Sequence, residues 1–171
     1  MTAHLEATGK RKTSCSCGQL TVTTTGDPVR ISICHCLACQ RRTGSVFGAQ
    51  ARFPLASVEI EGRASTYVRK GDSGNLLRFR FCPDCGATVY YLLDSMPDRV
   101  GVPIGGFGDP AFPRPRFSVY EARRHEWVTV PDDVEHLDLG PPKTSRRPAA
   151  DLAPDDRAPR RARDRSITIA A

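Results

Sequence analysis

Residues 34–45 read CHCLACQRRTGS, a stretch that places three cysteines and one histidine within its first six positions. Few apolar side chains separate these thiols, so ordinary core packing does not explain the cluster. Thiols stay reduced inside most cells, where clustered cysteines indicate metal binding or catalysis before disulfides. The role of this stretch therefore depends on how the four other cysteines are arranged.

The seven cysteines form three groups, which are Cys15-x-Cys17, Cys34-x-Cys36-x-x-Cys39 and Cys82-x-x-Cys85. An odd number of cysteines argues against a framework made only of paired disulfides. In CPDCG, residues 82–86, the proline stiffens a turn, and Gly86 can take the positive φ that other residues disfavour. Such a turn lets two sulfur atoms face one ion, as in a zinc knuckle.

The first and last groups together predict a closed structural zinc site. A glycine follows each pair, Gly18 in the first and Gly86 in the last. Four thiolates are the number that a tetrahedral structural zinc requires. The predicted ligands are Cys15, Cys17, Cys82 and Cys85. We expect this site to join the first strand to a hairpin over residues 79–91.

The middle group predicts a second, open zinc site. In a strand over residues 29–36, Cys34 and Cys36 project from one face and the apolar residues from the other. Cys39 then returns to the ion through a short helical turn, Leu37–Thr43. Three protein ligands with a vacant fourth position are typical of a catalytic zinc, where water or substrate completes the coordination.

Other arrangements of the middle group remain open from the residues alone. His35 as a fourth ligand would close the site and make it structural, although the alternation places it on the opposite face of the strand. Another partition joins Cys34 and Cys36 with the last cysteine pair. A redox role for Cys36 and Cys39 fits less well, because a thioredoxin-like motif belongs to a βαβ unit that this sequence does not predict.

The interior of the chain predicts an all-β domain over residues 13–139. Alternating apolar residues and turn residues mark short strands, with only residues 37–43 suggesting a helix. The strand candidates lie within LTVTTTGDP (20–28), VRISICHC (29–36), LLRFRFCPDCGATVYYLL (76–93), RVGVPIGGF (99–107) and RFSVYEARRHEWVTV (116–130).

The basic charge belongs to the two ends of the chain. Of the net charge of +6, residues 1–12 carry +2 and residues 139–171 carry +4, so residues 13–138 are neutral. We predict a flexible N-terminal segment over residues 1–12. We also predict a disordered Pro/Arg-rich tail over residues 140–171, which hold five prolines and no aromatic residue. A neutral domain with basic ends argues against nucleic acid as a partner of the domain.

The sequence predicts a soluble, cytoplasmic protein with no membrane partner. The N-terminal residues contain no apolar run typical of a secretory signal. No stretch approaches the ~20 apolar residues that a membrane-spanning helix needs. The sequence indicates no particular oligomeric state.

Four stretches together resemble the glutathione-dependent formaldehyde-activating enzymes, a family also described as S-hydroxymethylglutathione synthases and centromere protein V domains. They are CSCG (15–18), CHCLACQRRTGS (34–45), RFRFCPDCGATVYY (78–91) and VPIGGFGDP (102–110). The resemblance covers about residues 13–130 and includes the order and spacing of all seven cysteines. It implies a small, mainly β, barrel-like domain that binds two zinc ions.

The resemblance also implies a role for each group of cysteines. Structural zinc ligands of the family correspond to Cys15, Cys17, Cys82 and Cys85, and catalytic zinc ligands to Cys34, Cys36 and Cys39. The implied reaction is that of a carbon–sulfur lyase, joining the thiol of glutathione to formaldehyde or separating the two.

The two arginines directly after Cys39 are candidates for substrate binding. Arg41 and Arg42 can offset the negative charge of three zinc-bound thiolates and hold a carboxylate of glutathione. The alternative function is a non-catalytic, zinc-stabilised module that binds nucleic acid or protein. A related lyase acting on another thiol or electrophile is a further possibility.

Overall fold

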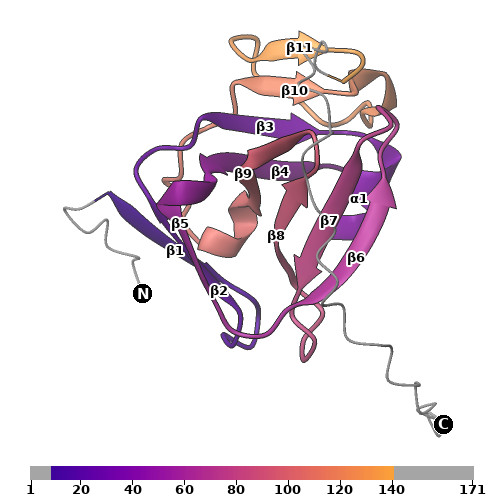
Figure 1. Cartoon of the computed structure of the whole chain (residues 1–171). Helices are drawn as coiled ribbons and strands as arrows, with labels where there is room; N and C mark the ends of the chain where they lie inside the picture. Colours follow the sequence, from indigo (N-terminus) through magenta and orange to yellow (C-terminus); the bar gives the residue numbers. More distant parts are fainter. Residues whose placement is uncertain (1–8, 141–171) are drawn as a thin grey trace, which may run out of the picture.

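The computed structural model of the chain describes residues 9–140, which form two β-sheets (Figure 1). The predicted mainly β fold is therefore confirmed. Its strands are β1 (Lys10–Ser14), β2 (Thr21–Thr25), β3 (Arg30–Cys34), β4 (Gly48–Pro54), β5 (Val58–Glu61), β6 (Ser65–Lys70), β7 (Leu76–Phe81), β8 (Thr88–Leu93), β9 (Met96–Pro103), β10 (Phe117–Val119) and β11 (Glu135–Leu137). The helical segments are α1 (Leu37–Thr43) and the 3₁₀ turns η1 (Leu55–Ser57), η2 (Ile104–Phe107) and η3 (Glu121–Arg123).

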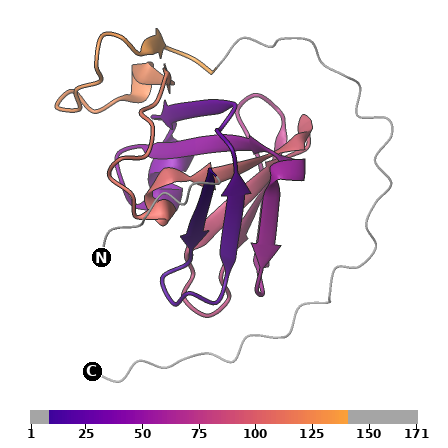
Figure 2. The ribbon, with the colours of Figure 1, turned by 90° about the vertical axis from the view of Figure 1, so that its left-hand side faces the viewer.

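The larger sheet has eight strands in the order β11-β10-β3-β4-β9-β8-β7-β6, and the smaller sheet has the order β1-β2-β5. Neighbouring strands are antiparallel except that β10 runs parallel to both β3 and β11. In this register Val119 pairs with Cys34. The parallel return brings the β10–β11 segment to one edge of the large sheet, beside the strand that ends in the cysteine motif (Figures 1 and 2).

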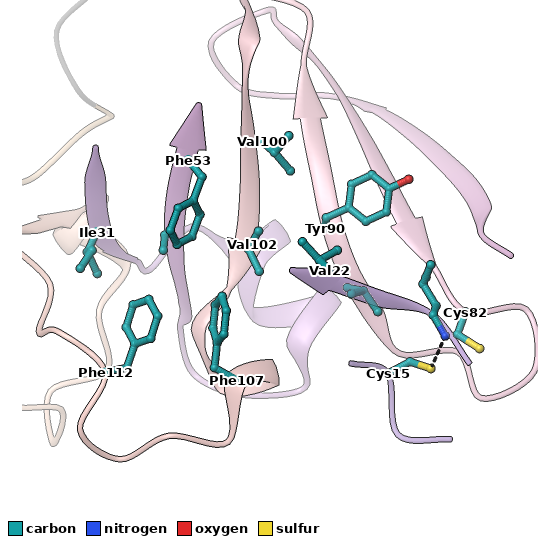
Figure 3. Packing of buried hydrophobic residues seen from close by; sticks show 13 residues of the cluster. Cys15, Val22, Ile31, Phe53, Cys82, Tyr90, Val100, Val102, Phe107 and Phe112 are labelled. Atoms are coloured by element: carbon teal, nitrogen blue, oxygen red, sulfur yellow. Dashed lines mark hydrogen bonds between the residues drawn. The ribbon is translucent and has the colours of Figure 1, made fainter. Parts of the chain in front are cut away.

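The hydrophobic core lies between the two sheets. Val22 from β2 packs with Phe53, Val100 and Val102 from the large sheet, and each of these side chains is fully buried (Figure 3). Ile31 of β3 also joins this cluster. Because successive side chains of a strand point to opposite faces, the core position of Ile31 places Cys34 on the other face. The cysteine motif therefore lies on the side of the sheet away from the core.

The predicted hairpin around CPDCG is present, since β7 and β8 flank this turn and pair as antiparallel strands. The predicted strand over residues 29–36 is shorter than expected. It ends at Cys34, and Cys36 instead forms the N-cap of α1, whose bounds agree with the predicted helical turn.

The ends of the domain differ in part from expectation. Residues 10–12, which fall within the N-terminal segment predicted to be flexible, belong to β1 and pair with β2. Residues 1–8 and 141–171 lie outside the described part of the chain, and with them nearly all of the predicted tail. Within residues 9–140 no helix has the length and apolar character needed to cross a membrane.

Candidate metal centres

Four cysteines from two distant parts of the chain form one cluster at the edge of the core. The ligand atoms of Cys15, Cys17, Cys82 and Cys85 all lie within 4.8 Å of one another. Cys15 and Cys82 are buried (Figure 3), whereas Cys17 and Cys85 are exposed. All four are free thiols. Four sulfur donors at this spacing can hold a metal ion, and an all-sulfur tetrahedral set is typical of structural zinc.

Glycines shape both turns of this four-cysteine cluster. Gly18 has a φ of 81° and Gly86 a φ of 73°, as expected for residues that follow the second cysteine of a knuckle. The backbone N–H of Gly86 donates to the carbonyl of Cys82 at 2.9 Å, and the N–H of Gly18 donates to that of Cys15 at 3.0 Å. These closed turns direct the paired sulfurs toward one point.

Gln19 supports the four-cysteine cluster and was missed by the sequence analysis. Its Nε2 lies 3.1 Å from Cys82 Sγ and 2.8 Å from the carbonyl oxygen of Arg63. Burial of Cys82 opposes ionisation, but hydrogen bonds from Gln19 and from backbone N–H groups lower the pKa of Cys82 to about 6. Such donors favour the thiolate that a metal requires. The sequence offers no signal for this role beyond the position of Gln19 after the first knuckle.

Three further cysteines form a second cluster at the start of α1. The sulfur atoms of Cys34, Cys36 and Cys39 lie within 4.8 Å of one another. Cys34 ends β3, Cys36 caps α1, and Cys39 lies in its first turn. In the described part of the chain, no further cysteine, histidine, aspartate or glutamate joins this group. The cysteines therefore divide as four and three, not as the alternative partition with Cys82 and Cys85.

His35 lies inside the fold and does not belong to the group of three sulfurs. It is fully buried, its Nε2 lies 3.1 Å from Ser118 Oγ, and its backbone N–H donates to the carbonyl of Val119 at 3.0 Å. Burial lowers the pKa of His35, which favours the neutral imidazole. In this geometry His35 anchors the cysteine loop to β10 and is not a fourth member of the cluster.

Gln40 also fixes the cysteine loop, a role that no pattern in the sequence indicated. Its Nε2 donates to the carbonyl of His35 at 2.8 Å and to the carbonyl of Arg123 at 3.1 Å. Its Oε1 lies 3.2 Å from Nε2 of His125. A single side chain thus joins the loop between two cysteines of the cluster to the turn η3.

The crowded thiols of the three-cysteine cluster compete for protons. Hydrogen bonds from Cys34 and Cys39 lower the pKa of Cys36 to about 2, and the hydrogen bond with Cys36 raises the pKa of Cys34. Proximity alone therefore does not ionise all three. A bound divalent cation can do so, because its charge offsets the repulsion among the thiolates.

A pocket of about 770 Å³ adjoins the three-cysteine cluster. It is lined by Leu37, Ala38, Arg41, Arg42, Tyr67, Arg69, Lys70, Asp72, Phe79 and Arg123. None of the three cysteines lines the pocket, but Ala38 lines it and also packs against the buried group that includes Cys34 and Cys36. The pocket is strongly basic, with five cationic side chains and a single carboxylate.

Both arginines predicted from the sequence line this pocket. The guanidinium of Arg42 lies over the ring of Phe79, 5.1 Å from its centroid, and its buried Nε has no hydrogen-bond partner. Phe79 in turn stacks with Tyr67, with centroids 6.5 Å apart. The other cations of the pocket, Arg69, Lys70 and Arg123, come from distant segments, and no local motif in the sequence indicated them.

The family model for glutathione-dependent formaldehyde-activating enzymes matches residues 10–123 of the chain. None of the curated proteins matches it. Among solved structures, a crystal structure of a Rhodobacter sphaeroides protein is 20% identical, covers 56% of this chain and 85% of its own, and has a TM-score of 0.43.

Proposed function

The chain belongs to the glutathione-dependent formaldehyde-activating enzyme family, and from this premise we propose that it is a zinc-dependent carbon–sulfur lyase. In the proposed reaction the thiol of glutathione adds to the carbonyl carbon of formaldehyde. A carbon–sulfur bond forms, the thiol proton ends on the former carbonyl oxygen, and nothing is oxidised or reduced. The reverse reaction breaks the same bond. The observation that carries the proposal is a group of three sulfurs, joined by no fourth protein ligand within residues 9–140, beside a basic pocket.

The donor atoms of both clusters fit zinc. Each cluster offers only sulfur, and thiolates are preferred ligands of zinc and of other soft metals. We assign Cys15, Cys17, Cys82 and Cys85 to a structural ion and Cys34, Cys36 and Cys39 to a catalytic one. A zinc ion at the three-cysteine cluster would supply a Lewis acid, which favours the thiolate of a bound thiol or polarises an aldehyde oxygen.

The side chains of the pocket bind and orient the thiol substrate in this proposal. Three thiolates and one divalent cation carry a net charge of −1, which repels an anionic tripeptide. Arg41 and Arg42 offset this charge, and a guanidinium can bind a carboxylate through two parallel hydrogen bonds. The stacked rings of Tyr67 and Phe79 add an apolar wall. The volume of the pocket lies within the usual range for small-molecule sites.

The hydrogen bonds of His35 and Gln40 hold the cysteine loop in place during this reaction. They tie the loop to β10 and to η3, so the three sulfurs keep their spacing when a substrate enters. We also propose a cytoplasmic location, because clustered cysteines that bind metal are typical of a compartment that keeps thiols reduced.

Stepwise removal of zinc tests the division into a closed and an open site. An incoming chelator can occupy the vacant position of an open site, so limited chelation should release about one zinc per chain while the circular dichroism of the fold persists. Simultaneous loss of both ions would contradict the proposal and favour the alternative, a binding module in which both metals are structural.

A further inference from the structure

The carboxylate of the basic pocket belongs to Asp72, in the turn between β6 and β7. Its Oδ2 accepts a hydrogen bond from Nη1 of Arg123 at 2.8 Å, although the two residues are 51 positions apart. Both side chains line the pocket. The pair therefore joins the β6–β7 turn to η3 across the pocket.

The stability of the fold does not account for this pair. The side chain of Asp72 is 48% exposed and that of Arg123 is 43% exposed. Ion pairs with this much exposure contribute little to folding, since water screens the attraction. For a ligand that is only anionic, the carboxylate of Asp72 would also be repulsive. A carboxylate within a cationic pocket instead suits a ligand that carries one positive group.

The pair keeps hydrogen-bonding capacity for such a ligand. Its hydrogen bond uses Oδ2 of Asp72 and Nη1 of Arg123, which leaves Oδ1 and the other guanidinium N–H groups. An acceptor and a set of donors thus lie side by side. This arrangement complements an ammonium and a carboxylate attached to the same carbon atom, as in a free amino acid.

The position of Arg123 is fixed relative to the three-cysteine cluster. Its carbonyl oxygen accepts a hydrogen bond from Gln40 at 3.1 Å, and the same Nε2 donates to the carbonyl of His35, between Cys34 and Cys36. The backbone that carries Arg123 is therefore tied to the loop between Cys34 and Cys36.

We propose that Asp72 and Arg123 bind the α-amino-acid end of the thiol substrate. Asp72 accepts hydrogen bonds from the α-ammonium group, and Arg123 donates to the α-carboxylate. The identity of the ligand rests on the proposed function, since glutathione has this zwitterionic group at one end and a second carboxylate at the other. The second carboxylate then lies at Arg41 and Arg42. The substrate class is accordingly thiols with a free α-amino-acid group, and thiols with an acylated amine are excluded.

Calorimetric titration of the zinc-loaded protein with two ligands tests this assignment without relying on turnover. The ligands are S-methylglutathione and its N-acetyl derivative, which differ in the ammonium group and cannot form a thiolate. The native protein should bind S-methylglutathione about tenfold more tightly than the N-acetyl derivative, as expected for one charge-assisted hydrogen bond. Asp72→Asn should lower the affinity for S-methylglutathione about tenfold. It should leave the affinity for the acetylated ligand unchanged or higher.

Asp94→Asn is the matched control, because Asp94 forms a comparable ion pair with Arg78 and neither residue lines the pocket. It should change neither affinity. Equal affinity of the native protein for the two ligands, equal weakening of both by Asp72→Asn, or no binding of either would overturn the assignment. Tighter binding of S-methylglutathione than of its N-acetyl derivative, without glutathione–formaldehyde turnover, would overturn the proposed function alone. Turnover with equal binding of the two ligands would overturn only the role of Asp72 and Arg123.

Discussion

The sulfur atoms of Cys17 and Cys82 lie 3.6 Å apart, although 65 residues separate them in the chain. Cys17 follows β1 of the small sheet, and Cys82 follows β7 of the large sheet. An ion bound among the four cysteines would therefore cross-link the two sheets at the edge of their shared core. The four-cysteine cluster and the three-cysteine cluster should accordingly respond very differently to substitution.

Substitution of a ligand in the four-cysteine cluster should destroy the fold. Structural zinc contributes on the order of 10 kcal/mol of folding free energy in small metal-binding systems. Cys82→Ser should therefore give insoluble or unfolded protein, measured by circular dichroism and thermal melting, whereas Cys39→Ser should stay folded. A soluble Cys82→Ser variant that melts at the native temperature would show that this cluster is not structural.

Substitution in the three-cysteine cluster should remove one ion and leave the other. Purified Cys39→Ala should contain about one zinc per chain by elemental analysis and keep the native circular dichroism spectrum. Asp94→Asn is the control, since Asp94 pairs with Arg78 and belongs to neither cluster, and it should keep two. Two zinc ions in folded Cys39→Ala would mean that Cys39 is not a ligand of the second ion.

Gly101 of β9 should not tolerate a side chain. A Cβ at this position would overlap the ring of Tyr91, which lies across the glycine from the neighbouring strand. Gly101→Ala should lower the free energy of unfolding by about 1–3 kcal/mol, the usual cost of overpacking, as measured by urea denaturation. In a Tyr91→Ala background the same substitution should lower the free energy of unfolding by clearly less. An equal decrease in both backgrounds would refute the overlap with the Tyr91 ring.

Removal of the predicted tail should leave the domain intact. A chain that ends at Leu139 keeps the hydrogen bond from the backbone N–H of Tyr120 to the carbonyl of Leu139, at 3.2 Å. It also keeps all seven cysteines. Its zinc content and melting temperature should equal those of the full chain. Unfolding of the shortened protein would place the domain boundary beyond residue 139.

The cysteine groups could be predicted from sequence because spacing within a turn is a local property. The knuckle of Cys82 and Cys85 is encoded within five consecutive residues, 82–86, which contain both cysteines and the glycine that takes a positive φ after them. The place of Cys36 was less predictable. Strand alternation assigned it to the face of Cys34, but its side chain accepts from the N–H of Cys39 and so starts the helix two residues after the strand ends.

The far wall of the pocket could not be predicted from local patterns. Arg69 and Lys70 end an edge strand, and Arg123 follows a strand that returns parallel to β3. These cations meet Arg42 only because of the strand order of the large sheet, and the sequence gives no local signal for that order. Asp72 was missed for the same reason, since its partner lies 51 residues away.

The most direct test of the central claim is the rate at which glutathione and formaldehyde exchange with their adduct at equilibrium. The uncatalysed addition also occurs, so the measurement is exchange spectroscopy by nuclear magnetic resonance at increasing protein concentration. The open-site account predicts an exchange rate that rises in proportion to native, zinc-loaded protein and stays at the uncatalysed value with folded Cys39→Ala. Equal exchange rates with the native protein, with Cys39→Ala and without protein would contradict it.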